Sequence, residues 1–265
     1  MIMGQDKNIS LLFSFLGGVI LLFILAPLLG LVLHSSPDEI TTTIHDKEVI
    51  NSIGLSLWSG MLATVISAFF AIPLAWLMAR KKFAGKNIIQ GIIDLPVVIP
   101  HSAAGIALLT LISRDGIVGK AGSIIGIEFP GHISGIVIAM AFVSLPFLIN
   151  AARDGFAAVP ERLEKVSLNL GASPIKTFMV VSVPLAWRSI VSGLIMMFAR
   201  GMSEFGAVII VAYYPMITPV MIFERFGAFG LKYSRPVAVI FIVVCLVFFI
   251  LLRFISKQKH NDKNR

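Results

Sequence analysis

The stretch NLGASPIKTFMVVSVPL, residues 169–185, decides how the chain folds, because it places a turn inside a very apolar sequence. In the segment VPERLEKVSLNL that leads into it, Pro160 can occupy the first turn of a helix. Gly171 can end that helix and Pro174 can begin the next one. The apolar run that follows is expected to break at Pro184. We therefore predict a short amphipathic helix, a tight turn and a second helix that enters an apolar layer.

The composition indicates a membrane protein. Of 265 residues, 57% are hydrophobic and only 14% are charged, whereas about a quarter of the residues of a soluble domain are charged. Because so few charges cannot cover a water-facing surface, we expect an integral membrane protein that contacts a lipid bilayer. The net charge of +8 fits the Lys and Arg of cytoplasmic loops. The chain has no nucleic-acid-binding motif, so we expect no nucleic acid partner.

Six segments are long and apolar enough to span a membrane as helices. We expect an all-α fold with about six transmembrane helices in a single domain, residues 1–265. The first apolar run is longer than the apolar region of a signal peptide, and no cleavage site of the A-x-A type follows, so it is expected to remain as a span. The predicted spans are residues 10–33, 52–79, 91–113, 133–152, 189–212 and 236–256.

The distribution of Lys and Arg orients these spans. Fifteen of them, including Lys259, Lys263 and Arg265, fall in the set of segments that holds both termini, and six fall in the other set. By the positive-inside rule, both termini are cytoplasmic in a multi-pass protein of the plasma or inner cell membrane. Residues 153–188 then form the largest cytoplasmic loop. The outer loop at residues 34–51 is acidic and long enough for a docking surface.

The chain lacks the sequence motifs of enzymes that make or break covalent bonds. It contains no phosphate-binding loop, HExxH sequence, GxSxG elbow or metal-spaced cluster of His and Cys. Its single cysteine, Cys245, lies in an apolar run and can form no disulfide within the chain. We expect a protein that moves, senses or anchors something, with no catalytic residue, metal or cofactor of its own.

The amphipathic segment before Gly171 allows two interpretations. It can lie on lipid headgroups as an interfacial helix, or it can protrude and fit a cleft on a cytoplasmic partner. Its charges are mixed in sign and its apolar stripe is short, and these features leave both interpretations open.

The same segment resembles the cytoplasmic EAA signature, EAA-x3-G-x9-I-x-L-P, of permease subunits of ABC importers. Gly171 precedes Pro184 by thirteen positions, with Val181 and Val183 where the family has Ile and Leu. The EAA triplet aligns with residues 165–167, and the acidic residue falls one position earlier. In that family the helix before the glycine docks on the ATPase as a coupling helix. The resemblance assigns ATPase coupling to Arg162, Leu163, Glu164, Lys165, Val166, Ser167, Leu168, Leu170, Gly171, Ala172, Ser173 and Pro174.

Two further stretches narrow the resemblance. DLPVVIPHSAAGIALL, residues 94–109, looks like the third-span signature of molybdate/tungstate permeases, with His101 where a second proline is common. ARGMSEFGAVIIVAYYPMITPVMIFERF, residues 199–226, is similar to the R-x-x-x-EFGA segment of the same group. Sulfate permeases share much of this pattern.

The resemblance implies a permease with the type I ABC importer (MetI-like) fold that acts as a homodimer. Two cytoplasmic ABC ATPase subunits would carry ATP and Mg, and an extracytoplasmic substrate-binding protein would deliver the substrate. The expected substrate is an oxyanion, molybdate or tungstate, with a sulfate-type permease as the alternative.

Several polar or helix-breaking residues lie within predicted spans. Pro96 and Pro100 each remove a backbone donor and are expected to kink their span, either as a packing kink or as a bend that lines the pore. Arg200 and Glu204 are four residues apart, so they can pair, either as a structural ion pair or at a gate. The full set of candidate pore and gate residues is Pro96, Pro100, His101, Ser102, Arg200, Ser203 and Glu204.

A secondary transporter driven by an ion gradient is a second hypothesis. That class often shows inverted repeats and carboxylates at mid-membrane sites. The sequence shows no clear repeat, and Glu204 is the one acidic residue that we expect deep in a span.

Overall fold

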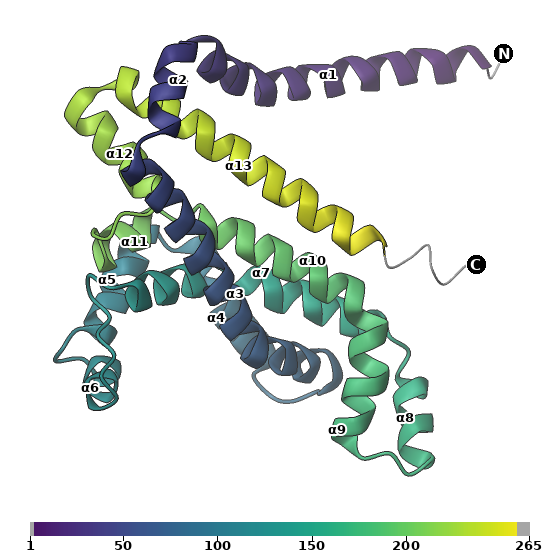
Figure 1. Ribbon diagram of the computed structural model, residues 1–265. Coiled ribbons are helices and arrows are strands. Elements are labelled where there is room, and N and C mark those ends of the chain that lie inside the picture. Colours follow the sequence, from purple (N-terminus) through teal and green to yellow (C-terminus); the bar gives the residue numbers. More distant parts are fainter. Residues whose placement is uncertain (1–2, 259–265) are drawn as a thin grey trace.

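The computed structural model describes residues 3–258, and every regular element in that range is helical (Figure 1). The predicted all-α fold is confirmed. The elements are α1 (Met3–Leu33), α2 (Pro37–Ile44), α3 (Lys47–Arg80), α4 (Lys86–Val98), α5 (His101–Ile112), α6 (Ile117–Ile124), α7 (Ile133–Ala158), α8 (Glu161–Asn169), α9 (Pro174–Thr177), the π-helical turn η1 (Phe178–Ser182), α10 (Val183–Met202), α11 (Gly206–Val211), α12 (Thr218–Phe229) and α13 (Leu231–Gln258).

Five helices are long and apolar enough to cross a membrane, and a sixth span arises if α4 and α5 count as one bent span. This agrees with the six spans expected. The five are Ile9–Leu33, Lys47–Arg80, Ile133–Ala158, Pro174–Met202 and Leu231–Leu252. The basic residues Lys259, Lys263 and Arg265, used above to orient the chain, lie outside the described residues.

The third span is broken at the second of its two prolines. α4 and α5 meet at an angle of 111°, and the break falls at Ile99 and Pro100, where Pro100 caps α5. Pro96 lies buried inside α4, which continues past it to Val98, so the helix does not end at this proline. A proline in the helix interior can be tolerated where neighbouring segments satisfy the freed backbone group.

The fifth span begins and ends earlier than predicted. It runs over Pro174–Met202 rather than residues 189–212, because Pro184 does not break the helix. The π-helical turn η1 precedes this proline, and the N–H of Val183 bonds back to the carbonyl of Phe178. The wider turn accommodates the residue that lacks a donor. At the other end, Ser203 caps α10 and α11 starts as a separate short helix.

Helices α3, α7 and α10 form the centre of the bundle, and small residues bring them together. A Cβ on Gly193 of α10 would lie 2.9 Å from the Cβ of Ala151 in α7, and one on Gly155 of α7 would lie 2.4 Å from the Cβ of Ser189. Close approach at small residues is the usual packing mode of membrane helices. α12 is joined to α3 by Thr218, whose N–H donates to Ser56 Oγ at 2.8 Å.

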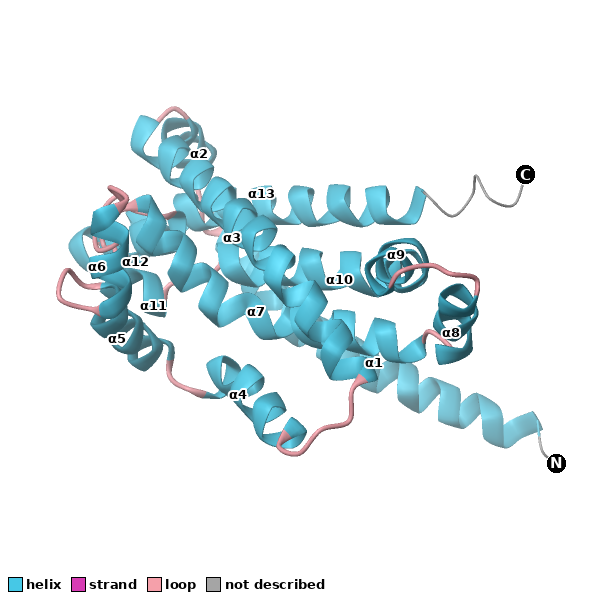
Figure 2. Ribbon diagram, turned by 90° about the horizontal axis from the view of Figure 1, so that it is seen from below, coloured by secondary structure: helices cyan, strands magenta, loops and turns pink. Residues whose placement is uncertain are grey.

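The helical bundle has two opposite ends, or poles, which both views show (Figures 1 and 2). The α8–α9 hairpin projects at one pole, toward which the start of α1 and the end of α13 also point. Helices α2, α6 and α12 lie at the other. α1 stands apart from the bundle, and none of its span is buried.

The crossing of α5 and α11 offers a test of this packing. A Cβ on Gly105 would lie 2.8 Å from Ile210 Cβ and 3.0 Å from the carbonyl oxygen of Ala207. We expect Gly105→Ala to lower the stability of the purified protein by about 1–3 kcal/mol through overpacking, measured by thermal unfolding in detergent. The control is Gly54→Ala, where no atom lies within 4 Å and the change is expected to be neutral or slightly stabilising. Equal effects of the two substitutions would contradict this packing.

Candidate functional site

The projecting hairpin has the local structure that its sequence predicts. Pro160 precedes α8, and Gly171 adopts the left-handed conformation, with φ +86°, just after that helix. A glycine at this position costs no steric strain. Ser173 then begins α9, since its side chain accepts a hydrogen bond from the N–H of Lys176. The predicted helix, tight turn and second helix are confirmed as structure.

Glu164 is the buried residue of α8, and it points into its own chain rather than outward. Its carboxylate accepts hydrogen bonds from Ser182 Oγ at 2.6 Å, from Arg80 Nε at 3.0 and 3.1 Å, and from Trp76 Nε1 at 3.4 Å. Arg80 also donates to the carbonyl oxygen of Val159 at 2.9 Å. The carboxylate thus joins α8 to the end of α3 and to η1.

The environment of Glu164 shifts its pKa. Burial alone raises the pKa of the carboxyl, but the hydrogen bonds from Arg80, Ser182 and Trp76, with the charge of Arg80, outweigh it and hold the pKa below its usual 4.5. Glu164 is therefore a carboxylate at neutral pH, and Arg80 is the charged group that faces it.

The remainder of α8 faces outward. Leu163, Val166 and Leu168 are exposed, and Leu170 is 83% exposed. Arg162 is exposed as well, and Lys165 pairs with Glu161 at 3.6 Å. Of the other residues assigned to coupling, Ser173 is exposed, Ala172 is half-buried, and Ser167 lies 2.9 Å from Thr177 Oγ1 within the hairpin. The hairpin therefore presents apolar and basic side chains on a surface that the other described residues do not cover.

A second polar cluster joins His101, Arg200 and Glu204. Glu204 is 1% exposed, and its carboxylate lies 2.8 Å from Arg200 Nη2 and accepts from His101 Nδ1 at 2.8 Å. Nη2 of Arg200 lies 2.9 Å from Nδ1 and 3.0 Å from Nε2 of His101. Because these two distances are nearly equal, the guanidinium nitrogen lies over the imidazole ring.

This cluster confirms that Arg200 and Glu204 pair, but not that the two residues lie on one face of a helix. Glu204 lies beyond the end of α10 rather than on a shared helix face, and its carboxylate also accepts from the N–H of Ala207 at 2.9 Å. His101 is brought in from α5, because a Cβ on Gly206 would lie only 2.6 Å from His101 Cβ. Ser102 and Ser203 are exposed beside the cluster.

The sequence reasoning missed a third polar cluster, between α4 and α7. Asp94 accepts from Gln90 Nε2 at 2.8 Å and from Asn150 Nδ2 at 2.7 Å, and Gln90 also donates to Asn150 Oδ1 at 2.8 Å. Glu204 is therefore not the one carboxylate within the spans. An Asp and an Asn inside apolar runs were the available signal, since such residues usually have partners within the bundle.

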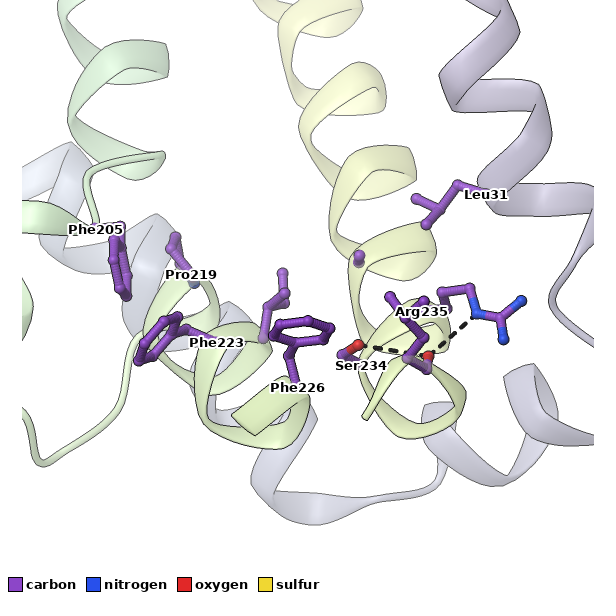
Figure 3. Close-up of a pocket in the computed structure, with 10 residues that line it drawn as sticks. Leu31, Phe205, Pro219, Phe223, Phe226, Ser234 and Arg235 are labelled. Carbon is purple, nitrogen blue, oxygen red and sulfur yellow. Dashed lines mark hydrogen bonds between the residues drawn. The ribbon is translucent and has the colours of Figure 1, made fainter. Parts of the chain in front are cut away.

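A groove of about 390 Å³ lies between α12, α13 and the end of α1 (Figure 3). Its lining is mainly hydrocarbon, including Phe205 and Phe223, whose rings lie 5.0 Å apart. Arg235 at its edge donates to the carbonyl oxygens of Leu231 and His34. This apolar surface is unsuited to an oxyanion. Among residues 3–258, no group of three or more His, Cys, Asp or Glu side chains could hold a metal ion.

The Glu204 cluster makes a stability prediction. Glu204→Ala would leave Arg200, His101 and the Ala207 N–H without their shared acceptor. We expect a loss of about 2–4 kcal/mol, below the full value for a buried pair, because 25% of the Arg200 side chain and 36% of the His101 side chain are exposed. Ser203→Ala is the control, expected within about 0.5 kcal/mol, since that exposed hydroxyl donates to the carbonyl of Arg200 in the helix that it caps. Thermal unfolding in detergent measures both, and a neutral Glu204→Ala would contradict the cluster.

Glu164 makes a prediction about pH. Its folded pKa lies below 4.5, so the stability that its charge contributes is complete above that pH. The contribution is lost as the pH falls through the folded pKa. We expect the melting temperature of wild type to exceed that of Glu164→Gln at neutral pH, with the gap closing below pH 4.5. Glu161→Gln, at an exposed position of the same helix, is the control and should change the melting temperature little. A gap for Glu164→Gln that stays constant in acid would contradict the shift.

Comparison with known proteins places the chain in a family. The family model described as binding-protein-dependent transport system inner membrane component matches residues 71–261. A molybdate/tungstate transport system permease protein of Pyrococcus abyssi is 43% identical over 97% of this chain and 99% of its own length. A probable sulfate transport system permease protein of Zygnema circumcarinatum is 30% identical over 91% of this chain and 86% of its own.

The fold is also similar to that of a solved ABC importer. The crystal structure of a bacterial ABC transporter involved in the import of the acidic polysaccharide alginate contains a chain with a TM-score of 0.72 and 18% identity. The match covers 98% of this chain and 100% of that chain. This likeness supports the expected permease fold. By its family match and its relatives, the chain belongs to the inner membrane components of binding-protein-dependent transport systems.

Proposed function

We propose that this chain is the permease subunit of an ATP-driven importer of an oxyanion, molybdate or tungstate. The observation that carries the proposal is the projecting α8–α9 hairpin in a chain of this transport family. The apolar face of this hairpin is exposed and is suited to bind a partner. The relative at 43% identity is named for molybdate and tungstate, and the sulfate-type relative is less similar at 30%. A sulfate permease is therefore the second candidate.

The partners follow from surfaces that the chain leaves uncovered. Two cytoplasmic ATPase subunits, which carry ATP and Mg, would bind the α8 hairpins of a homodimer. α1, with none of its span buried in its own chain, is available to pack on the second copy. A substrate-binding protein would dock outside, where Ser36 and Glu39 form a capping box that begins α2 and Asp38 is exposed. The chain itself would perform no hydrolysis.

The orientation follows the positive-inside rule. The pole with the α8 hairpin, the start of α1 and the end of α13 would face the cytoplasm, in the plasma or inner membrane of the cell. The cytoplasmic surface is then smaller than the predicted loop at 153–188, since α7 continues to Ala158 and the next span begins at Pro174.

In this mechanism the chain moves and the ATPase supplies the energy. ATP binding would close the ATPase dimer, α8 would transmit the displacement, and the bent α4–α5 span and α10 would open the path outward. The cluster at Glu204, where α5 meets the end of α10, lies where such a movement must repack side chains. In this cluster the negative charge of Glu204 compensates the positive charge of Arg200. The translocation path would therefore offer an oxyanion only weak contacts, such as hydrogen bonds from the hydroxyls of Ser102 and Ser203. Weak contacts permit release.

A cysteine crosslink tests the docking of α8. Leu170→Cys, in a chain whose own Cys245 is replaced by alanine, is expected to trap an ATPase subunit in native membranes with a yield that changes with ATP. Leu170 is suitable because it is 83% exposed, and Ile124→Cys is the control because Ile124 is 85% exposed on α6 at the opposite pole. The control should react with an impermeant thiol reagent from outside and trap no ATPase.

The opposite result would overturn the proposal. If Cys at position 170 reacts freely with a water-soluble reagent, traps no partner and ignores nucleotide, α8 is only an interfacial helix. A secondary carrier would then become the better explanation of the fold.

A further inference from the structure

The contacts of Glu164 bear on how movement of α8 reaches the membrane spans. We propose that Glu164 and Arg80 form an internal clamp that passes the displacement of α8 to α3 and α10, so that both are positioning residues for coupling rather than contacts with the ATPase. This inference rests on the proposed docking of α8.

Several elements meet at this carboxylate. Arg80 is the last residue of α3, Trp76 lies one turn before it, and Ser182 is the last residue of η1. Through its second hydrogen bond, Arg80 also holds the carbonyl oxygen of Val159, the residue that caps the end of α7. α3, α7 and the α9–α10 span are therefore tied to α8 at one point.

The clamp is a charge-assisted attachment of α8 to α3. Both partners are buried, with 7% of the Arg80 side chain and 11% of the Glu164 side chain exposed. Charge-assisted hydrogen bonds are stronger than neutral ones, and low exposure strengthens them further. The leucines of α8 are 40–83% exposed, so much of their apolar surface is not packed against the spans. A force on α8 can therefore pass to the spans through the bonds of Glu164 and through the Ser167–Thr177 bond, in addition to the chain on either side of the helix.

The π-helical turn lies on the receiving side of the clamp. It ends at Ser182, the donor of the shortest hydrogen bond to Glu164 at 2.6 Å. At its start, Phe178 lies against Trp76 with ring centroids 5.8 Å apart and against Phe156 with centroids 5.9 Å apart. π-helical turns are local departures from the α-helical ladder and are frequent at functional sites. Here the turn links the clamp to an aromatic contact among α3, α7 and the α10 span.

A direct contact between Glu164 and an ATPase is the competing role. To reach another protein, the carboxylate would have to give up its bonds to three side chains and leave the guanidinium of Arg80 buried without its partner. Such an exchange is costly. The exposed neighbours Arg162, Leu163 and Val166 need no such change to dock.

The test uses the assembled transporter in proteoliposomes and measures oxyanion imported per ATP hydrolysed. We expect Glu164→Gln to lower this ratio at least about fivefold, within the usual range of a coupling free energy, while ATP hydrolysis and the ATP-dependent crosslink at Leu170→Cys persist. Glu161→Gln, an exposed acidic residue of the same helix, is the matched control and should leave the ratio unchanged.

Two variants at Arg80 test whether Arg80 and Glu164 act through one contact. Arg80→Lys keeps the charge but cannot reach both Glu164 and the Val159 carbonyl, so we expect an intermediate ratio. Arg80→Met combined with Glu164→Gln should lose no more than the more damaging single variant, because both act through one contact.

The outcomes distinguish the two proposals. An unchanged ratio in Glu164→Gln overturns the clamp. Loss of the crosslink in Glu164→Gln alone, with wild type still crosslinked, also overturns the clamp, because Glu164 is then a docking contact. Failure of the crosslink in the otherwise wild-type chain overturns the proposed docking itself.

Discussion

The burial of one carboxylate organises the end of the bundle from which the α8–α9 hairpin projects. Glu164 lies on a short helix that projects beyond the spans, and it would be costly to bury without a counter-charge. Arg80 at the end of α3 supplies that charge, at 3.0 Å. Since Ser182 and Trp76 complete the shell, the hairpin is fixed to two spans while its apolar side chains stay exposed. Glu164 thus makes its contacts within the chain, while its exposed neighbours on α8 remain available to bind a partner.

A similar constraint operates where α5, α10 and α11 meet. Two interruptions, the 111° bend before α5 and the early end of α10, place His101 and Arg200 around the buried Glu204. Interrupted helices at membrane depth require internal partners for their polar groups. The breaks and the charges therefore support each other. Both polar clusters lie at the ends of long helices, where a bundle can change shape while its helices stay rigid.

The parts of the fold that depend on local rules could be predicted from the sequence. The helix before Gly171, the turn and the start at Pro174 depend on neighbouring residues, and so does the pairing of Arg200 with Glu204. The errors arose where distant residues decide. Pro184 is accommodated by the π-helical turn η1, and no local sequence pattern predicted that turn. The contact of Arg80 with Glu164 joins residues 84 positions apart, and Arg80 alone indicated only the cytoplasmic end of a span.

The central claim is that this chain moves an oxyanion when ATP acts on a partner subunit. The most direct test is uptake of molybdate and tungstate into proteoliposomes that contain the chain with its ATPase and binding protein. The account predicts uptake only when ATP is supplied on the side of the α8 hairpin, and none when the ATPase subunit is left out. Uptake by the chain alone, driven by an ion gradient and indifferent to ATP, would contradict it.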